Sequence, residues 1–157
     1  ANTPDARMEL YGNGGDDLIG IAFKSAFASS DSNRIEVDGG TGNDTLVTLS
    51  LTQDNSRVYL RGGEGNDRIY GYANYSHLYG GAGEDVMYGG LYNTLYVSAT
   101  GADKLYGNVG VDTFYFRPLD SNNVQGRDTI YNFDVTKDWI QLNMSDMGVK
   151  NFTIDVA

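Results

Sequence analysis

Short stretches of alternating apolar and polar residues follow one another along the chain, and glycine-rich stretches separate them. Between residues 62 and 88 the chain reads GGEGNDRIY, GYANYSHLY and GGAGEDVMY, which are consecutive nonapeptides without a gap. Alternation over about four to eight residues predicts a half-buried β-strand, and glycine clusters predict the turns between strands. The pattern therefore predicts an all-β chain in which short strands recur at a fixed interval.

Several segments share one glycine- and aspartate-containing form. They read YGNGGDDLI from residue 11, GGTGNDTLV from 39, GGEGNDRIY from 62, GGAGEDVMY from 80, SATGADKLY from 98 and GNVGVDTFY from 107. The clearest copies have the form Gly-Gly-x-Gly-x-Asp-x-apolar-x, which is the nonapeptide signature of calcium-binding parallel β-rolls. The chain therefore resembles the RTX (repeats-in-toxin, hemolysin-type calcium-binding) family. This resemblance implies a right-handed parallel β-roll, a two-sheet β-helix in which each turn is made of two nonapeptides.

The spacing of the copies distributes them over two edges of such a roll. The copies at 62, 80 and 98 follow one another at a constant interval of two nonapeptides, so they stack on one edge, and insertions bring the copies at 11 and 39 onto the same edge. The other edge is formed by the segments 20–38, 48–61, 71–79 and 89–97. Ser76 and Thr94 occupy the place of the repeat aspartate there, and this edge regains an aspartate only at Asp112. We therefore expect an asymmetric roll with calcium-binding loops mainly along one edge.

The apolar residue two positions after each repeat aspartate is expected to point into the roll. These residues are Leu18, Leu46, Ile69, Met87 and Leu105 in one sheet and Phe114 in the other. Further on, TFYF, DTIYNF and DWIQL predict strands that resemble the segment following the roll in RTX proteases and adhesins. The residues expected to close the open end of the roll, as a solenoid requires, are Phe114, Phe116, Phe133, Trp139, Ile140 and Leu142. The predicted organisation is one domain over 1–157, with repeats at 10–115 and capping strands at 116–157.

The composition of the chain argues against several classes of function. The 157-residue chain has a formal net charge of -10, and it has no cysteine. This charge repels nucleic acid and anionic membrane surfaces and attracts cations. No apolar run reaches the length needed for membrane insertion. The only histidine is His77, which leaves an HExxH zinc motif or a catalytic triad without support. We expect no enzyme activity in this chain itself, which could still be a non-catalytic domain of a secreted enzyme.

The repeat aspartates are the principal candidate metal ligands. At the strand spacing of about 4.8 Å, stacked carboxylates repel one another strongly unless cations lie between them. Glycines let carbonyl oxygens approach an ion, and such oxygens suit calcium better than magnesium. The predicted calcium-binding positions are Gly12, Gly14, Asp16, Gly39, Thr41, Asn43, Asp44, Gly62, Glu64, Asn66, Asp67, Gly80, Ala82, Glu84, Asp85, Thr100, Ala102, Asp103 and Asp112. In the family each ion lies between successive loops, which implies about four Ca²⁺ on one edge, and a further ion near Asp112 is left open.

Tyr70, Tyr88 and Tyr106 form a predicted outward row, which is either sheet packing or a ligand surface. The resemblance to the RTX family implies export through bacterial type I secretion machinery and folding on calcium outside the cell. The expected function is a module that supports or anchors a larger extracellular protein. The alternative is a polysaccharide- or cell-surface-binding module, like the repeat modules of alginate epimerases or RTX adhesins. In both cases we expect a secreted monomer.

Overall fold

The computed structural model describes residues 7–23, 34–50, 57–73, 75–91, 94–97, 100–116 and 127–142. The strands in these ranges are β1 (Arg7–Tyr11), β2 (Leu18–Phe23), β3 (Arg34–Thr41), β4 (Thr45–Ser50), β5 (Arg57–Glu64), β6 (Arg68–Tyr72), β7 (Tyr75–Ala82), β8 (Val86–Tyr88), β9 (Thr94–Val97), β10 (Lys104–Tyr106), β11 (Thr113–Phe116), β12 (Thr129–Tyr131) and β13 (Trp139–Leu142). No helix in the described ranges is long and apolar enough to cross a membrane.

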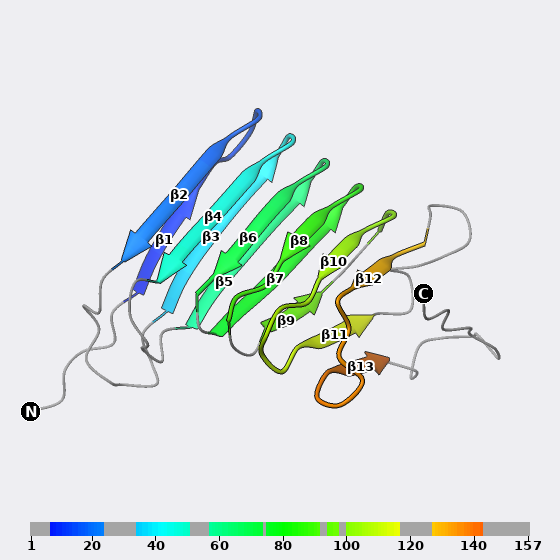
Figure 1. Cartoon of the computed structure of the whole chain (residues 1–157). Helices are drawn as coiled ribbons and strands as arrows, with labels where there is room; N and C mark the ends of the chain where they lie inside the picture. The colour runs from blue at the N-terminus through cyan, green and yellow to red at the C-terminus, as the bar shows by residue number, and fades with distance from the viewer. Residues whose placement is uncertain are drawn as a thin grey trace, which may run out of the picture.

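Successive strands alternate between two sheets, which lie one behind the other in Figure 1. The odd-numbered strands form a seven-stranded sheet in the order β1-β3-β5-β7-β9-β11-β13, and the even-numbered strands form a six-stranded sheet in the order β12-β10-β8-β6-β4-β2. Every pairing is parallel. Partners in neighbouring turns are often separated by two nonapeptides, as in the pairing of Ile69 with Met87. The fold is therefore the parallel β-roll that the resemblance carried by the nonapeptide signature implies.

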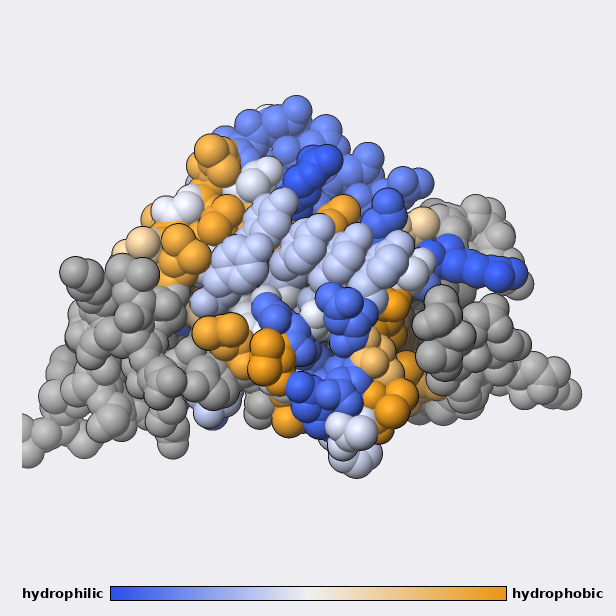
Figure 2. Space-filling model, in the orientation of Figure 1, coloured by the Kyte–Doolittle hydropathy of each residue, from blue (hydrophilic) through white to orange (hydrophobic). Residues whose placement is uncertain are grey.

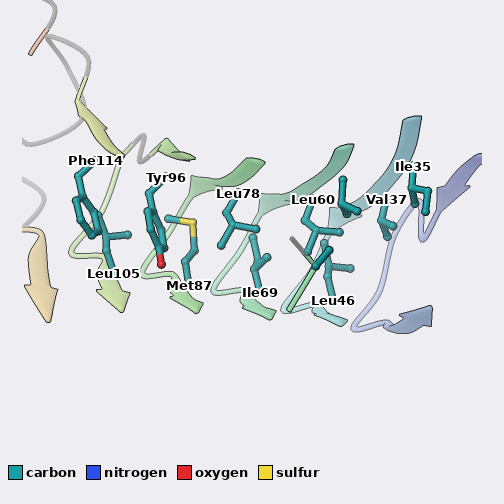
Figure 3. Close-up of a cluster of buried hydrophobic side chains, with 12 residues drawn as sticks. Ile35, Val37, Leu46, Leu60, Ile69, Leu78, Met87, Tyr96, Leu105 and Phe114 are labelled. Carbon is teal, nitrogen blue, oxygen red and sulfur yellow. The ribbon is translucent and has the colours of Figure 1, made fainter. Parts of the chain in front are cut away.

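A thin core of inward side chains fills the space between the sheets (Figure 3). In this view Leu60, Leu78, Tyr96 and Phe114 extend toward Leu46, Ile69, Met87 and Leu105. Each of these eight residues is no more than 1% exposed, and burial of one such side chain stabilises the fold by about 1.5–3 kcal/mol. The inward orientation predicted for Leu46, Ile69, Met87, Leu105 and Phe114 is confirmed.

The first repeat enters its sheet one residue later than predicted. Ile19 is the residue that pairs with Leu46, and it packs against the core. Leu18 lies on the outward face and is 78% exposed, so its predicted inward position is wrong. The error arises because this copy contains two consecutive aspartates, and an alignment on its glycines selects the first of them.

The strands after the last repeat continue the roll. β12 pairs with β10 and β13 pairs with β11, so each sheet gains one strand. The partly buried side chains that pack against the core here are Phe116, Ile130, Phe133 and Ile140. Trp139 is 67% exposed, and its predicted place in the cap is wrong because alternation along β13 turns Ile140 inward and Trp139 outward. The described part of 116–157 is the last turn of the roll.

Candidate metal centre

We call the first edge the row of loops 12–17, 39–44, 62–67, 80–85 and 100–103, each leading from an odd-numbered strand to the next even-numbered strand. Gly40, Gly63 and Gly81 share the second position of these loops, with φ values of 103°, 119° and 107°. A Cβ atom on Gly63 would lie 2.0 Å from the Gly40 carbonyl oxygen, and one on Gly81 would lie 2.1 Å from the Gly63 carbonyl oxygen. Glycine is therefore required for the loops to stack this closely and to align their carbonyl oxygens.

Each repeat aspartate on the first edge uses one carboxylate oxygen to hold the loop before it. Asp67 Oδ1 accepts a 2.8 Å hydrogen bond from the backbone N–H of Asp44, and Asp85 Oδ1 accepts one of 2.8 Å from Asp67. Asp103 Oδ1 accepts a 2.9 Å hydrogen bond from the backbone N–H of Asp85. The side chains of Asp44, Asp67, Asp85 and Asp103 are all buried. The structure thus brings these predicted residues together in one continuous row.

In four of the first-edge aspartates, the other carboxylate oxygen is left without a partner. The Oδ2 atoms that are buried and accept no hydrogen bond belong to Asp17, Asp44, Asp67 and Asp85. A Cβ atom on Gly62 would lie 2.1 Å from Asp67 Oδ2 and 2.5 Å from the Gly80 carbonyl oxygen. Because a buried, unpartnered carboxylate oxygen is strongly unfavourable, a cation is the group that this oxygen-lined space accommodates.

Burial makes the row costly to ionise. Burial raises the pKa of Asp67 to about 6, and it raises the pKa of Asp85 to about 7, although a backbone hydrogen bond lowers each value. The negative charges of Asp103 and Asp67 raise the pKa of Asp85 further. At neutral pH the carboxylates therefore need a positive charge nearby.

The donor set indicates which cation fits. Among the described residues, no three histidine, aspartate or glutamate side chains converge on one point. An ion on the first edge must therefore be held by backbone carbonyl oxygens together with few carboxylates. Calcium accepts many oxygen ligands in flexible geometry, whereas magnesium requires a strict octahedron. The oxygens present fit calcium.

The third-position residues contribute carbonyl oxygens that connect the loops. The Glu64 carbonyl oxygen accepts a 2.8 Å hydrogen bond from the backbone N–H of Gly42, and the Ala82 carbonyl oxygen accepts one of 2.8 Å from Gly65. Thr41 and Thr100 use their carbonyl oxygens in the same way. A carbonyl oxygen has two lone pairs, so this bond leaves one available.

The fifth-position residues form a second polar row. The backbone N–H of Asn66 donates to Asn43 Oδ1 at 2.8 Å, and the backbone N–H of Glu84 donates to Asn66 Oδ1 at 2.7 Å. Ala102 has no side-chain oxygen at this position. The structure therefore gives the side chains of Asn43 and Asn66 a loop-stacking role.

Asp17, and not Asp16, occupies the aspartate position of the first loop. The backbone N–H of Asp17 donates to Asp44 Oδ1 at 2.8 Å, which repeats the pattern of the later loops. Asp16 lies at the fifth position, where its Oδ1 accepts a 2.7 Å hydrogen bond from Asn43. Asn13 replaces the second glycine with a φ of 75°. Asparagine tolerates positive φ, so Asn13 can take the place of the second glycine. Recognising this substitution in the sequence would have aligned Gly12 with the first glycine of the later copies.

Asp128 extends the row by a further turn. Its Oδ1 accepts a 3.0 Å hydrogen bond from the backbone N–H of Asp103. The predicted cap included this region, and Asp128 was not predicted at the metal edge. The available signal was the order Asp, Thr, Ile at 128–130, which repeats the aspartate-x-apolar pattern of the earlier copies.

We call the second edge the loops 71–76, 89–94, 107–112 and 132–138, at the opposite ends of the strands. Asp112 Oδ2 accepts a 2.8 Å hydrogen bond from the backbone N–H of Asn108, and its Oδ1 accepts one of 3.2 Å from Thr94. Asp138 Oδ2 likewise accepts a 2.8 Å hydrogen bond from the backbone N–H of Asp134. Here the repeat position caps its own loop, and both oxygens of Asp112 have backbone donors.

The predicted tyrosine row is a stack of four rings. Ring centroids lie 5.1 Å apart for Tyr70 and Tyr88, 4.4 Å for Tyr88 and Tyr106, and 4.5 Å for Tyr106 and Tyr131. Figure 2 shows this row of rings crossing the outward face of the six-stranded sheet. Tyr131 was not predicted. The rings cover one another's faces, so packing within the sheet accounts for the row, and a ligand there stays a prediction.

A comparison with protein-family models bears directly on the first edge. A model of the RTX calcium-binding nonapeptide repeat matches the chain in four copies, over residues 36–49, 61–91 and 94–117. Residues 36–49, 61–91 and 94–117 are therefore RTX calcium-binding nonapeptide repeats. The matched residues include the loops of Asp44, Asp67 and Asp85, whose Oδ2 atoms are buried and unpartnered. No curated protein and no solved structure matched the chain. The matched part of the chain is a calcium-binding module, and its repeat is a binding element without a catalytic role.

Proposed function

We propose that this chain is a folding switch operated by calcium. It stays unfolded without calcium and folds when calcium binds after bacterial type I secretion. Once folded, it supports or anchors a larger extracellular protein. The observation that carries this proposal is the row of buried Oδ2 atoms on the first edge, which lack any hydrogen-bond partner.

The ions lie between successive loops of the first edge. Asp44 and Asp67 would hold one ion together with the carbonyl oxygen of Gly62, and the other intervals repeat this arrangement. Five loops have four intervals, so about four ions bind along the edge. Bound calcium supplies the positive charge that buried carboxylates need. We expect no ion near Asp112, because each of its oxygens accepts a backbone N–H and neither is left buried without a partner, unlike Asp67 Oδ2.

Folding depends on calcium because the core alone buries too little apolar surface to stabilise the fold. The inward side chains form a single layer between two sheets, and 21 glycines add conformational entropy to the unfolded chain. The formal charge of -10 further opposes compaction. The binding free energy of calcium is then folding free energy, as in other metal-dependent domains.

Far-UV circular dichroism with a calcium chelator tests this switch. We expect the β signal to be lost on chelation, to return on adding calcium, and to stay absent with magnesium alone. A chain that keeps its β signal in excess chelator at pH 8 would contradict the proposal. Secretion is tested separately by expressing the chain with a type I exporter and measuring the fraction found in the medium with and without that exporter.

A further inference from the structure

The outward face of the six-stranded sheet carries a stack of tyrosine rings that belongs neither to the core nor to the calcium edge. We propose that this stack is a site of oxidative cross-linking, at which hydrogen peroxide and a haem peroxidase join Tyr106 to Tyr88 or to Tyr131 by a carbon–carbon bond between the rings. The product is a dityrosine bridge between neighbouring turns. The reaction requires the folded roll and uses no residue of the calcium sites.

The register of the strands brings the phenols together. Tyr88 pairs with Tyr106 across β8 and β10, and Tyr106 pairs with Tyr131 across β10 and β12. The ring centroid of Tyr106 lies 4.4 Å from that of Tyr88 and 4.5 Å from that of Tyr131, and in both pairs the ring planes are only 9° from parallel. Tyr106 therefore has a phenol stacked on each of its faces.

The stacked rings of Tyr88 and Tyr106 have the same orientation. Partial burial raises the pKa of Tyr88, and the neighbouring Tyr106 hydroxyl raises it further through its charge and through a hydrogen bond. The two hydroxyl groups are therefore neighbours. Because the ring planes are also nearly parallel, the ring carbon beside one hydroxyl faces its counterpart on the other ring. These carbons are the positions at which two phenoxyl radicals join.

An oxidant can reach the stack. Figure 2 shows the rings on the surface of the sheet, and Tyr131 is 38% exposed. Tyr88 and Tyr106 are half-buried, because neighbouring rings cover their faces. The core phenol Tyr96 differs in both respects, since it is 0% exposed and stacks on Phe114, which has no hydroxyl group. Access and a phenol neighbour therefore coincide in the outward stack.

The coupling is a two-electron oxidation. Each of the two phenols gives up one electron and the proton of its hydroxyl group, and the two phenoxyl radicals form one bond between the ring carbons that face each other. The hydrogen atoms displaced from these carbons move to the oxygens, which restores both hydroxyl groups. The two electrons and two protons reduce one hydrogen peroxide to two water molecules at the peroxidase. The stack contributes proximity and orientation, which increase the rate of such a coupling strongly.

A bridge at this place links the shortest strands of the roll. The strands β8, β10 and β12 each have three residues, and the chain contains no cysteine that could join its turns by a disulfide. A bridge between Tyr88 and Tyr106 closes a loop of two nonapeptides. Closing a loop reduces the conformational entropy of the unfolded chain. The bridged protein should therefore fold at a lower calcium concentration.

Peroxidase treatment of the calcium-loaded protein tests the proposal. The wild type, Tyr106→Phe and Tyr59→Phe are incubated with hydrogen peroxide and a haem peroxidase, and dityrosine is measured by its fluorescence and by mass spectrometry of peptides. Tyr59→Phe is the matched control, because Tyr59 is also a half-buried outward ring, but it stacks on His77 and the Arg34 guanidinium, which are not phenols. Circular dichroism in calcium first verifies that each protein is folded, so failure of the calcium switch is seen separately.

We expect the monomer to lose two hydrogen atoms, with Tyr106 linked to Tyr88 or Tyr131 in the peptides. Tyr106→Phe lowers the dityrosine yield about fivefold, because the remaining pair, Tyr70 and Tyr88, has ring centroids 5.1 Å apart. Tyr59→Phe leaves the yield unchanged. Absence of dityrosine in the folded wild type overturns the proposal, as do equal losses in the two variants or links found only between molecules.

A calcium titration of the bridged monomer tests the consequence for folding. We expect the calcium midpoint, followed by circular dichroism, to be roughly threefold lower than in the untreated wild type, because the loop-closure stabilisation is shared among about four ions. Peroxidase-treated Tyr106→Phe is the control and should keep its own midpoint. An unchanged midpoint in the bridged wild type overturns the stabilising role of the bridge.

Discussion

On the first edge a repeat aspartate such as Asp67 has one bonded and one unpartnered carboxylate oxygen, whereas on the second edge Asp112 has backbone donors for both. The two residues occupy the same position of the same repeat. The difference lies in the loop: on the second edge, the N–H group of Asn108, earlier in the same loop, takes the oxygen that remains free on the first edge. We therefore expect an aspartate in the repeat position to mark an ion site only where the backbone of its own loop does not cap it.

The largest expected difference between the two edges is in the unfolding free energy lost by Gly62→Ala and by Gly107→Ala. A Cβ atom on Gly62 would fill the space between Asp67 Oδ2, at 2.1 Å, and the Gly80 carbonyl oxygen, at 2.5 Å. At Gly107, the first glycine of a second-edge loop, the nearest atom is Asp112 Oδ2 at 3.2 Å. We expect Gly62→Ala to cost more than about 3 kcal/mol of unfolding free energy in calcium, and Gly107→Ala to cost less than about 1 kcal/mol. Urea unfolding in saturating calcium measures both, and similar costs would contradict the comparison.

Asp67→Asn removes a charge and leaves the fold contacts nearly intact. Its amide oxygen can still accept the N–H of Asp44, but the unpartnered oxygen is replaced by an NH₂ group. We expect the calcium midpoint for folding to rise about tenfold, since this side chain faces two intervals of the row. Ser76→Ala is the second-edge control. It removes a 2.8 Å hydrogen bond to the Gly71 carbonyl, which costs about 1 kcal/mol and shifts the midpoint less.

Circular dichroism during a calcium titration compares these two variants. A larger shift for Ser76→Ala than for Asp67→Asn would show that the first edge does not bind the ion. Equal shifts would show that the variants act only through general stability.

Acid should partly replace calcium on the first edge. The pKa values of Asp67 and Asp85 are raised by burial to about 6 and about 7. The calcium-free folded state therefore binds protons more tightly than the unfolded chain. This contribution to stability is fully present below the unfolded aspartate pKa of 3.8, and it is lost as pH rises through about 7. In chelator, we expect more β signal by circular dichroism at pH 5 than at pH 8, and Asp85→Asn should reduce the difference.

Much of the fold follows from the repeat spacing. Copies separated by two nonapeptides stack in register, so the pairing of Ile69 with Met87 and the inward orientation of both are readable from the sequence. Insertions of unequal length removed this guide near the N-terminus. The stretch between the partners Arg7 and Arg34 is longer than the stretch between Arg34 and Arg57, and both are longer than two nonapeptides. The pairing of Arg7 with Arg34, and of Arg34 with Arg57, therefore emerges only from the register of the folded strands.

The candidate site was predictable in composition but not in detail. The stacking of Asp44 and Asp67 follows from their place in the repeat. The choice between Asp16 and Asp17 follows only if Asn13 is recognised as the substitute for the second glycine, because the glycines of this copy alone align Asp16 with the later aspartates. The hydrogen bond that caps Asp112 Oδ2 depends on a turn that brings the backbone N–H of Asn108 within 2.8 Å. No residue type in that loop predicts this turn.

The number of calcium ions bound by the wild type, Asp67→Asn and Asp112→Asn tests the account most directly. Equilibrium dialysis against calcium at a concentration that saturates folding gives the count for each protein. We predict about four ions for the wild type, the same number for Asp112→Asn, and fewer for Asp67→Asn. Loss of an ion in Asp112→Asn, with the full count retained in Asp67→Asn, would contradict it.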